Sequence, residues 1–397
     1  MRQDEANGRI LILHNYYRQT GGEDAVVAAE RELLLGKGHQ VSFYTKHNDA
    51  IADLSPVRLA RLTFWNQEAH DEIAALCRRE SIWLAHFHNT FPLISPAAYY
   101  AAKAQGVPVV QTLHNYRLLC ANALLMRDGK VCEDCLGRSP WRGVLHRCYR
   151  DSFGATAVAA AMLCYHRWKR TYSQMVDVYI ALTEFARRKF IEGGLPPEKI
   201  AVKPNFVHPD PGPGTGAGGF ALFVGRLSPE KGLPTLLRAW ERVGNRLPLK
   251  IAGDGPLAAQ VQDAAKRNAA LSWLGQVPSA QVMALLGEAA VLVFPSECYE
   301  TFGRSIAEAF ARGTPVIASR LGAMTEMVRH GETGLFFKSG DADDLAAQVE
   351  LTLSHPSEIA AMRKACRAEF EAKYTAERNY KLLMEIYERA IAASRQR

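Results

Sequence analysis

One stretch constrains the fold more than any other, residues 291–319, with the sequence VLVFPSECYETFGRSIAEAFARGTPVIAS. A short apolar run ends at Pro295, and a polar turn leads to Gly303. A helical run of small and apolar residues then ends at Gly313, before a second apolar run. Two buried strands joined by one helix form a βαβ unit, which requires a parallel sheet. The carboxyl ends of such strands are where open α/β sheets bind ligands.

The same alternation of strands and helices runs through the whole chain. Strands are predicted at 10–13, 41–44, 84–87, 107–113, 178–182 and 200–203 in the first half, and at 220–225, 249–252, 271–274, 291–294, 316–318 and 335–337 in the second. Helices are predicted at 24–36, 96–105, 186–192, 234–243, 256–267, 304–312, 344–353, 357–374 and 376–393. This pattern is typical of an open, doubly wound α/β fold.

A break in composition separates the halves. Residues 204–219, PNFVHPDPGPGTGAGG, are rich in Pro and Gly and read as a linker. We therefore expect two Rossmann-like domains, at 1–203 and 220–370, facing a central cleft. The last helix, 371–397, is expected to cross back to the N-terminal domain, which also carries a Cys-rich insertion at 120–148.

Composition narrows the functional class. The 397 residues are 48% hydrophobic and 22% charged, a balance typical of globular proteins. No apolar run approaches the length of a membrane span, and the first one is too short for a secretory signal, so a cytoplasmic protein is expected. The net charge of +7 suits anionic ligands or an anionic membrane surface, but it is too diffuse to indicate nucleic acid.

Two acids frame the helical run described first. Glu300 lies in the turn before it, and Glu308 shares one helical face with Arg304. Gly303 lets a ligand approach the N–H groups of the first helical turn, where the helix dipole favours an anion. An anion seat with a carboxylate on either side suits a phosphate between two polyols, as in a nucleotide sugar. The alternative is a Glu308–Arg304 salt bridge with Glu300 in solvent.

Two further loops follow predicted strands. Gly21 and Gly22 allow close approach of backbone to phosphate, but no complete G-x-G-x-x-G is present and a tight turn explains them as well. Arg226 can hold phosphate oxygens bidentately, and Lys231 adds a point charge nearby. A solvated basic loop is the alternative for this pair.

The segments FVGRLSPEKG, IAGDGP, FPSECYETFGRSIAEAFARGTPVIAS and GETGLFF, in this order, resemble the retaining glycosyltransferases of family 4, which have the GT-B fold. The resemblance covers nearly the whole chain. It implies that Arg226 and Lys231 hold the donor diphosphate, Glu308 the ribose hydroxyls and Glu300 the hydroxyls of the transferred sugar. It places backbone groups beside phosphate, sugar or base at Gly21, Gly22, Val277, Thr301, Phe302 and Gly303, and it places His114 beside the reacting sugar.

The activity implied is hexosyl transfer with retention from a UDP- or GDP-sugar to a polysaccharide or lipid-linked oligosaccharide. Because Arg and Lys supply the cations, no catalytic metal is expected. Asp341 and Asp343 have D-x-D spacing but are interpreted as helix caps. His114 could instead be a loop histidine with a structural hydrogen bond. Nucleotide-sugar epimerisation, or non-catalytic binding as a scaffold, remain the functional alternatives.

Four cysteines raise a metal question. Cys120, Cys132, Cys135 and Cys148 give the spacing C-x11-C-x2-C-x12-C, which could close a structural zinc site or could be four reduced thiols.

A basic, partly apolar surface patch is also possible, and it would allow peripheral contact with an anionic inner membrane. The alternative is a solvated helix face. The residues concerned are 157–163 with Arg167, Lys169, Arg170, Arg187, Arg188 and Lys189.

Overall fold

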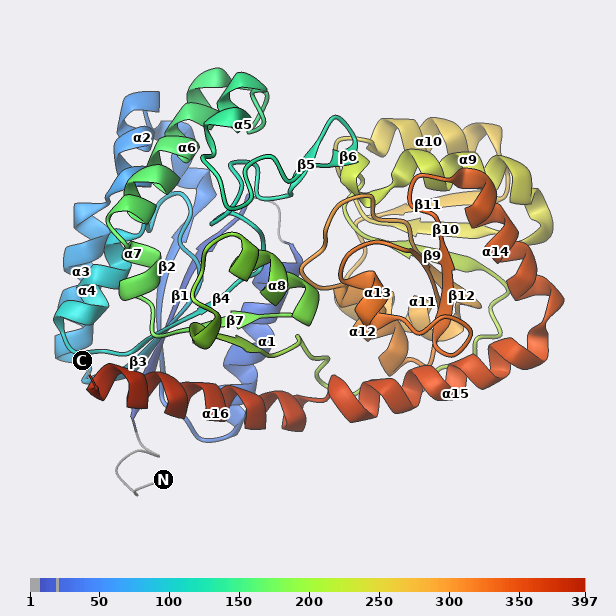
Figure 1. The fold of residues 1–397 in the computed structure, drawn as a ribbon. Coiled ribbons are helices and arrows are strands. Elements are labelled where there is room, and N and C mark those ends of the chain that lie inside the picture. Colours follow the sequence, from blue (N-terminus) through green and yellow to red (C-terminus); the bar gives the residue numbers. More distant parts are fainter. Residues whose placement is uncertain (1–7, 19–20, 397) are drawn as a thin grey trace. The chain divides into compact units, whose positions relative to one another are not determined.

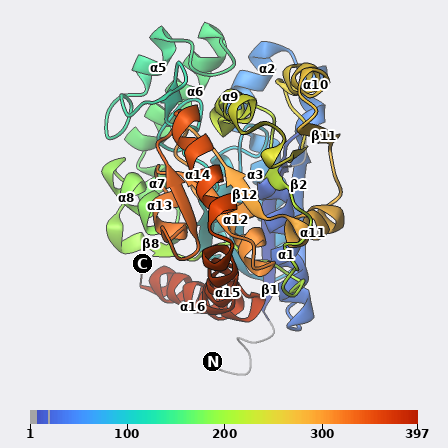
Figure 2. The ribbon, with the colours of Figure 1, turned by 90° about the vertical axis from the view of Figure 1, so that its right-hand side faces the viewer.

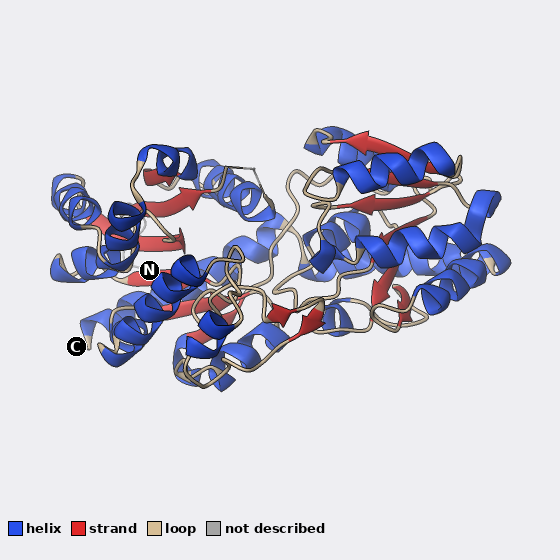
Figure 3. Cartoon of the chain, turned by 90° about the horizontal axis from the view of Figure 1, so that it is seen from above, coloured by secondary structure: helices blue, strands red, loops and turns tan. Residues whose placement is uncertain are grey.

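The computed structural model describes residues 8–18 and 21–396. The chain divides into two compact units. Unit 1 comprises the residues up to Leu125, Glu133–Pro204 and the residues from Glu377 onward. Unit 2 comprises Met126–Cys132 and Asn205–Ala376. In both units helices cover the faces of a sheet, as Figure 3 shows in blue and red.

Unit 1 is built on a six-stranded sheet in the order β2-β1-β3-β4-β7-β8, and every pairing in it is parallel. The chain leaves β1 first toward β2 and then toward β3, so the order reverses at β1. Ligands of open α/β sheets bind at such a switch point. The strands are β1 (Arg9–Tyr16), β2 (Val41–His47), β3 (Ile82–Asn89), β4 (Val109–Thr112), β7 (Val178–Ala181) and β8 (Ile200–Val202).

The helices of unit 1 are labelled in Figure 1. They are α1 (Gly22–Gly36), α2 (Pro56–Phe64), α3 (Gln67–Arg79), α4 (Ala97–Ala104), α5 (Trp141–Leu145), α6 (Phe153–Trp168), α7 (Thr171–Gln174), α8 (Glu184–Glu192) and α16 (Ala376–Arg395). Apolar side chains of α1 and α16, including Val27, Leu34, Leu383 and Ile386, pack with strand residues in one core cluster. The last helix of the chain therefore belongs to the core of unit 1.

Unit 2 is built on a second parallel sheet in the order β11-β10-β9-β12-β13-β14. Here the order reverses between the central neighbours β9 and β12, which makes this pair the switch point. The strands are β9 (Ala221–Val224), β10 (Leu249–Ala252), β11 (Leu271–Gly275), β12 (Val291–Phe294), β13 (Val316–Ser319) and β14 (Gly334–Phe337).

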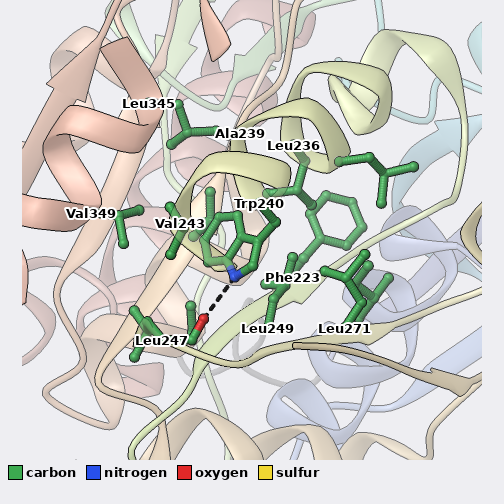
Figure 4. Packing of buried hydrophobic residues seen from close by; sticks show 14 of the residues in the cluster. Phe223, Leu236, Ala239, Trp240, Val243, Leu247, Leu249, Leu271, Leu345 and Val349 are labelled. Atoms are coloured by element: carbon green, nitrogen blue, oxygen red, sulfur yellow. Dashed lines mark hydrogen bonds between the residues drawn. The ribbon is translucent and has the colours of Figure 1, made fainter. Parts of the chain in front are cut away.

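The helices of unit 2 are α9 (Leu233–Val243), α10 (Ala258–Arg267), α11 (Ser279–Glu288), α12 (Arg304–Ala311), α13 (Met324–Met327), α14 (Ala342–Ser354) and α15 (Pro356–Lys373). The chain ends in two long helices, α15 and α16, drawn in red in Figure 2. Trp240 of α9 lies in the centre of the core, where its indole N–H donates to the Leu247 carbonyl at 2.8 Å (Figure 4). Its neighbours there are strand residues such as Phe223 and Leu249, and Val349 of α14. This apolar core supports the strand ends that carry the loops described below.

The predicted strands of both sheets are confirmed, with ends that shift by a few residues. The predicted capping role of Asp341 is also confirmed, because its carboxylate accepts from the N–H groups of Asp343 and Asp344 at 3.2 Å. Several elements were not predicted. They are α2, α3, α5, α6, α7, α11, α13 and the hairpin of β5 (Met126–Arg127) with β6 (Lys130–Val131).

The apolar stretch 157–163, considered above as part of a surface patch, is largely buried. Ala159, Ala160, Met162 and Leu163 are at most 3% exposed, because α6 turns this face into the core. Several basic residues of that patch are also engaged in the fold. Arg167 donates to the Leu118 carbonyl at 2.8 Å, for example.

Further engaged residues are Arg187, which donates to the Ile200 carbonyl, and Lys189, which pairs with Glu133 and Glu192. Different residues of α5 and α6 carry the exposed apolar groups, among them Trp141, Leu145, Phe153 and Trp168.

Candidate active site

The loops after β9 and β12 meet at the switch point of unit 2. The Glu297 N–H donates to the Glu230 carbonyl at 2.9 Å, which ties the two loops together through their backbones. Gly232 has a φ of +70°, and a Cβ there would lie 1.8 Å from the Pro295 carbonyl oxygen. Only glycine fits such an approach. Gly232, which follows Lys231 after β9, and Pro295, which follows β12, are therefore in direct contact.

Lys231 and Glu300 form an ion pair across this contact. The ammonium lies 2.6 Å from Glu300 Oε1, and the side chains are 29% and 13% exposed. The Ser296 hydroxyl donates to the same carboxylate oxygen. Burial works to lower the pKa of Lys231, but the Glu300 carboxylate outweighs it and raises this pKa above its ordinary value. Lys231 is therefore a fixed positive charge at the carboxyl end of β9.

Glu308 and Arg304 form a second pair on the first turns of α12. Arg304 Nε lies 2.9 Å from Glu308 Oε1, and Glu308 is 7% exposed. Burial raises the pKa of Glu308, and the Arg304 guanidinium partly opposes this shift. On the opposite face of α12, Ile306 and Phe310 are fully buried, as predicted. The salt bridge considered as an alternative is therefore present, and ribose binding by Glu308 stays a prediction.

The other predicted donor residues of unit 2 lie on the same edge of its sheet. Gly303 is the N-cap residue of α12, with buried Thr301 and Phe302 directly before it. Arg226 is exposed in the loop after β9, and Val277 is half-buried in the loop between β11 and α11. These residues thus follow the carboxyl ends of β9, β11 and β12 in one sheet.

In unit 1 the glycine loop starts α1. The Gly21 N–H donates to Asp24 Oδ2 at 2.8 Å, while Asp24 Oδ1 lies 2.7 Å from Nε2 of the buried His14 on β1. Gly21 thus occupies the N-cap position of the helix. The prediction that Gly21 donates to a phosphate requires that this hydrogen bond be exchanged. Gly22 is the exposed first residue of α1.

His114 follows β4 and joins a buried polar cluster. Its Nε2 lies 2.9 Å from Nδ1 of His88 on β3, with the two rings stacked. Nε2 of His88 lies 3.4 Å from Glu30 Oε1 on α1, and Glu30 Oε2 pairs with Lys203 at 3.1 Å. His86 Nδ1 lies 2.9 Å from the same Glu30 oxygen. His86 and Glu30 are at most 1% exposed, and His88 is 3% exposed.

Charges inside this cluster are compensated by its own members. Burial would raise the pKa of Glu30, but the Lys203 ammonium and His86 hold it well below its usual range. Burial and His86 lower the pKa of His88 to about 3. Burial and the neighbouring His88 lower the pKa of His114 well below its ordinary value. At neutral pH the cluster therefore holds the Glu30–Lys203 ion pair beside neutral rings of His88 and His114.

The four cysteines of the insertion do not form a set of metal-ligand distance. All of the cysteines are free of disulfide bonds. Cys120 and Cys135 are buried, and Cys120 donates to Asn122 Oδ1 at 2.9 Å. Across residues 8–18 and 21–396, the one group with ligand atoms within 4.8 Å of one another is Glu30, His86 and His88. The zinc site stays a prediction. A zinc content far below one per chain in pure, untagged protein would remove it.

Comparison with known proteins decides the family. The family model for glycosyl transferases group 1 matches residues 216–369, and the model for Glycosyltransferase Family 4 matches residues 20–211. The chain belongs to the group 1 glycosyltransferases. The first model spans every donor-site residue of unit 2 described above, and the second spans His114, His88, His86, Glu30 and Lys203 of the buried cluster in unit 1.

The relatives match over unequal lengths. Glycogen synthase from Mycobacterium tuberculosis (strain ATCC 25618 / H37Rv) is 37% identical over 150 residues, which are 36% of this chain and 36% of the relative. D-inositol 3-phosphate glycosyltransferase from Acidothermus cellulolyticus is 30% identical over 298 residues, covering 68% of this chain and 59% of the relative. The glycosyltransferase thus aligns with less than two thirds of either relative.

A solved structure matches along the whole chain. HepE from Anabaena, in complex with UDP and glucose, has a TM-score of 0.67 and 18% identity and covers 96% of this chain and 99% of HepE. At this identity the likeness shows the fold, which is GT-B. Each of the two parallel sheets described above is one Rossmann-like domain of that fold.

Proposed function

We propose that this glycosyltransferase moves a hexose from a nucleoside diphosphate sugar, UDP- or GDP-linked, to a growing polysaccharide or lipid-linked oligosaccharide, with retention of anomeric configuration. One observation carries the proposal. Lys231 and Glu300 are joined at 2.6 Å at the switch point of unit 2, directly before the start of α12. A cation that can bind the diphosphate, Lys231, thus lies next to a carboxylate that can bind sugar hydroxyls, Glu300.

The residues of this spot have distinct tasks in the proposed reaction. The bond from the anomeric carbon to the diphosphate oxygen breaks, and negative charge grows on the leaving diphosphate. Lys231, Arg226 and the N–H groups at the start of α12 stabilise that charge, which is the usual largest contribution to such catalysis. No catalytic metal is required in this scheme, because the cations are side chains.

Retention follows if the acceptor attacks from the face that the diphosphate leaves. The acceptor oxygen forms the new bond to the anomeric carbon, and its proton passes to the leaving diphosphate oxygen. Glu300 accepts hydrogen bonds from hydroxyls of the transferred sugar, Glu308 from those of the ribose, and backbone near Val277 contacts the base. His114 of unit 1 serves the same sugar as a neutral imidazole.

A saccharide acceptor is supported by the glycogen synthase match. Lipid-linked acceptors are supported by the surface of unit 1. No helix of residues 8–18 and 21–396 combines the length and hydropathy of a membrane-crossing segment. Phe153 and Trp168 on α6, however, are 61% and 76% exposed, and Leu145 on α5 is 79% exposed. Exposed basic residues accompany them, at Arg142, Arg147, Arg150, Lys169 and Arg170.

Exposed aromatic and cationic side chains on and around two helices that pack together, α5 and α6, suit the interface of an anionic bilayer. We therefore place peripheral contact with such a membrane at α5 and α6. Sedimentation with vesicles tests it: binding to vesicles with anionic lipid should exceed binding to neutral ones and fall with salt. The pair Phe153→Ala and Trp168→Ala should abolish binding, whereas Leu351→Ala on α14 of unit 2, 45% exposed, should not. Equal binding by both variants contradicts this surface.

A thermal-shift panel of UDP, GDP, ADP and their sugars, without added metal, tests the donor. A ligand at about a hundred times its dissociation constant adds roughly 2.7 kcal/mol of stability. A shift with uridine or guanosine compounds alone supports the proposal. A shift with adenosine compounds alone corrects the donor base, and no shift with any of them favours a non-catalytic scaffold.

The reaction itself is tested with the donor so identified and a set of saccharide acceptors. NMR of the first product gives its anomeric configuration, and inversion would contradict retention. Conversion of the donor sugar into an epimer without acceptor would instead favour the epimerase alternative.

A further inference from the structure

The buried cluster of unit 1 does more than fill the core. His86 and His88 lie two residues apart on β3, so they project from one face of the sheet toward Glu30 of α1. A buried carboxylate beside two imidazoles has the chemistry of a metal site. Here, however, the ammonium of Lys203 lies 3.1 Å from Glu30 Oε2 and supplies the positive charge. Lys203 is itself held by Asn379 Oδ1 at 3.1 Å.

The proton positions of His88 follow from its two contacts. Its Nε2 faces Glu30 Oε1 at 3.4 Å and has no closer hydrogen-bond partner among the described residues, while the same oxygen also lies 2.9 Å from Nδ1 of His86. An unprotonated Nε2 would set two lone pairs against each other. The proton of the neutral ring therefore lies on Nε2, and Nδ1 carries the lone pair.

The protonated nitrogen of His114 follows from that of His88. Its Nε2 lies 2.9 Å from Nδ1 of His88. Because Nδ1 of His88 can only accept, Nε2 of His114 must donate. This assigns the proton of His114 to Nε2 and makes its Nδ1 an acceptor. Any group that His114 meets through Nδ1 must be a donor, as a sugar hydroxyl is and a carboxylate is not.

We propose that His88, oriented by Glu30, is a positioning residue that holds His114 in one ring orientation and one tautomer for the transfer reaction. The inference rests on the proposed function, because it assumes that His114 serves that reaction. Its geometrical part does not: the tautomer is set by the cluster whether or not a sugar is transferred.

A matched pair of substitutions separates the two contacts of His88. The amide of Asn reaches about as far as Nδ1, so His88→Asn keeps an acceptor for His114. The amide of Gln reaches the position of Nε2, so His88→Gln keeps a partner for Glu30 but not for His114. His39→Asn is the control, because His39 bonds to Tyr380 outside the cluster.

Kinetics with the transferred sugar give the first readout. We expect His88→Gln to lower kcat about tenfold with little change in KM for the donor, as the loss of one hydrogen bond predicts. His88→Asn should keep most of kcat, and His39→Asn all of it. Equal losses in the Asn and Gln variants would reduce His88 to a structural role, and no loss in either would remove it from the reaction.

Nitrogen-15 NMR of histidine-labelled wild-type protein gives the second readout, and it needs no sugar transfer. Two-bond correlations distinguish the tautomers, and the spectrum of His114→Asn identifies the signals of His114. We expect His114 and His88 to carry their protons on Nε2 near neutral pH. A proton on Nδ1 of His114 overturns the inference. If wild-type protein transfers no sugar, the proposed function fails while this spectrum still decides the tautomer.

Discussion

Unit 2 keeps the Lys231–Glu300 pair of its site in loops at the edge of the sheet, whereas unit 1 carries a charge pair inside, on the first helix and directly after β8. Lys231 and Glu300 are 29% and 13% exposed above an apolar core. Glu30 and Lys203 are each 1% exposed, within the fold. Under the proposed function, the same architecture would separate function from stability in unit 2 and combine them in unit 1.

The difference has an electrostatic reason. At the edge of a sheet, water and an incoming anion can solvate a lysine, so the apo site tolerates a Lys–Glu pair without further support. In the interior each charge must find its partner in the fold, and removal of one partner leaves the other unsolvated. Substitutions in unit 2 should therefore change activity, and those in unit 1 stability first.

The largest expected effect is on the stability of unit 1. Lys203→Ala should lower the free energy of unfolding by roughly 3–5 kcal/mol, because Glu30 would remain buried without its cation. Lys266→Ala in unit 2, whose side chain is 67% exposed, should change it by less than about 1 kcal/mol. Urea unfolding of the wild-type protein and of the two variants measures both changes in the free energy of unfolding. A Lys203→Met, Glu30→Leu double variant should recover much of the loss, and failure to do so would show that His86 and His88 depend on the carboxylate.

The second effect is on activity in unit 2. Lys231→Ala should lower kcat/KM by roughly 100- to 1,000-fold, the usual result of removing one donor to a developing negative charge. Its melting temperature should change little, since the ion pair lies at the sheet edge. Full activity in this variant would break the assignment of Lys231 to the diphosphate, and unfolding would break the separation of function from stability.

Features of the two units that depend on neighbouring residues could be predicted from the sequence, whereas contacts between distant segments could not. The two sheets were predictable, because each strand is a local apolar run and the alternation with helices sets the class. The donor loops were predictable in the same way, since Lys231 and Glu300 each follow a strand within a few residues. What brings them together is the pairing of β9 with β12, and a doubly wound order implies that pairing.

The grouping of His114 with His86, His88, Glu30 and Lys203 was not predicted, because these residues come from α1, β3, the segment directly after β8 and the loop after β4. One signal was present. His86 lies in the predicted strand, and Glu30 lies on the apolar face of the predicted helix 24–36, so each placed a polar group where burial was expected. Their partnership depends on contacts between distant segments, for which periodicity carries no information. Helices such as α2 and α3 were missed for a simpler reason: their polar residues mask a short apolar stripe.

The third effect is a difference in acid sensitivity. The pKa of His88 falls to about 3 and that of His114 falls well below its ordinary value, so both bind protons more readily in the unfolded chain. Below the unfolded pKa of about 6.5 the free energy of unfolding should drop by about 2.7 kcal/mol per pH unit for the two together. His39 and His166, whose pKa values burial also lowers, act in the same direction and lie in unit 1.

Glu308 of unit 2 has a raised pKa, so its contribution has the opposite sign and is lost as pH rises. Hydrogen exchange measured at pH 5.5 and 7.5, corrected for intrinsic rates, would compare the units directly. Peptides from β1 and β3 should lose protection at pH 5.5 relative to those from β9 and β12. Equal losses in both units would refute the assignment of acid sensitivity to the cluster.

The smallest effect concerns Glu308, the residue of unit 2 that most resembles those of unit 1 in its burial. Glu308→Gln keeps an acceptor but removes the charge, so we expect KM for the donor to rise about tenfold, the cost of a weaker hydrogen bond to a hydroxyl. The free energy of unfolding should stay within about 1 kcal/mol, because burial already disfavours the carboxylate and Arg304, 31% exposed, can be solvated. A loss of stability as large as that of Lys203→Ala would contradict this prediction. It would show that a buried charged group stabilises the fold even when it lies at the edge of the sheet.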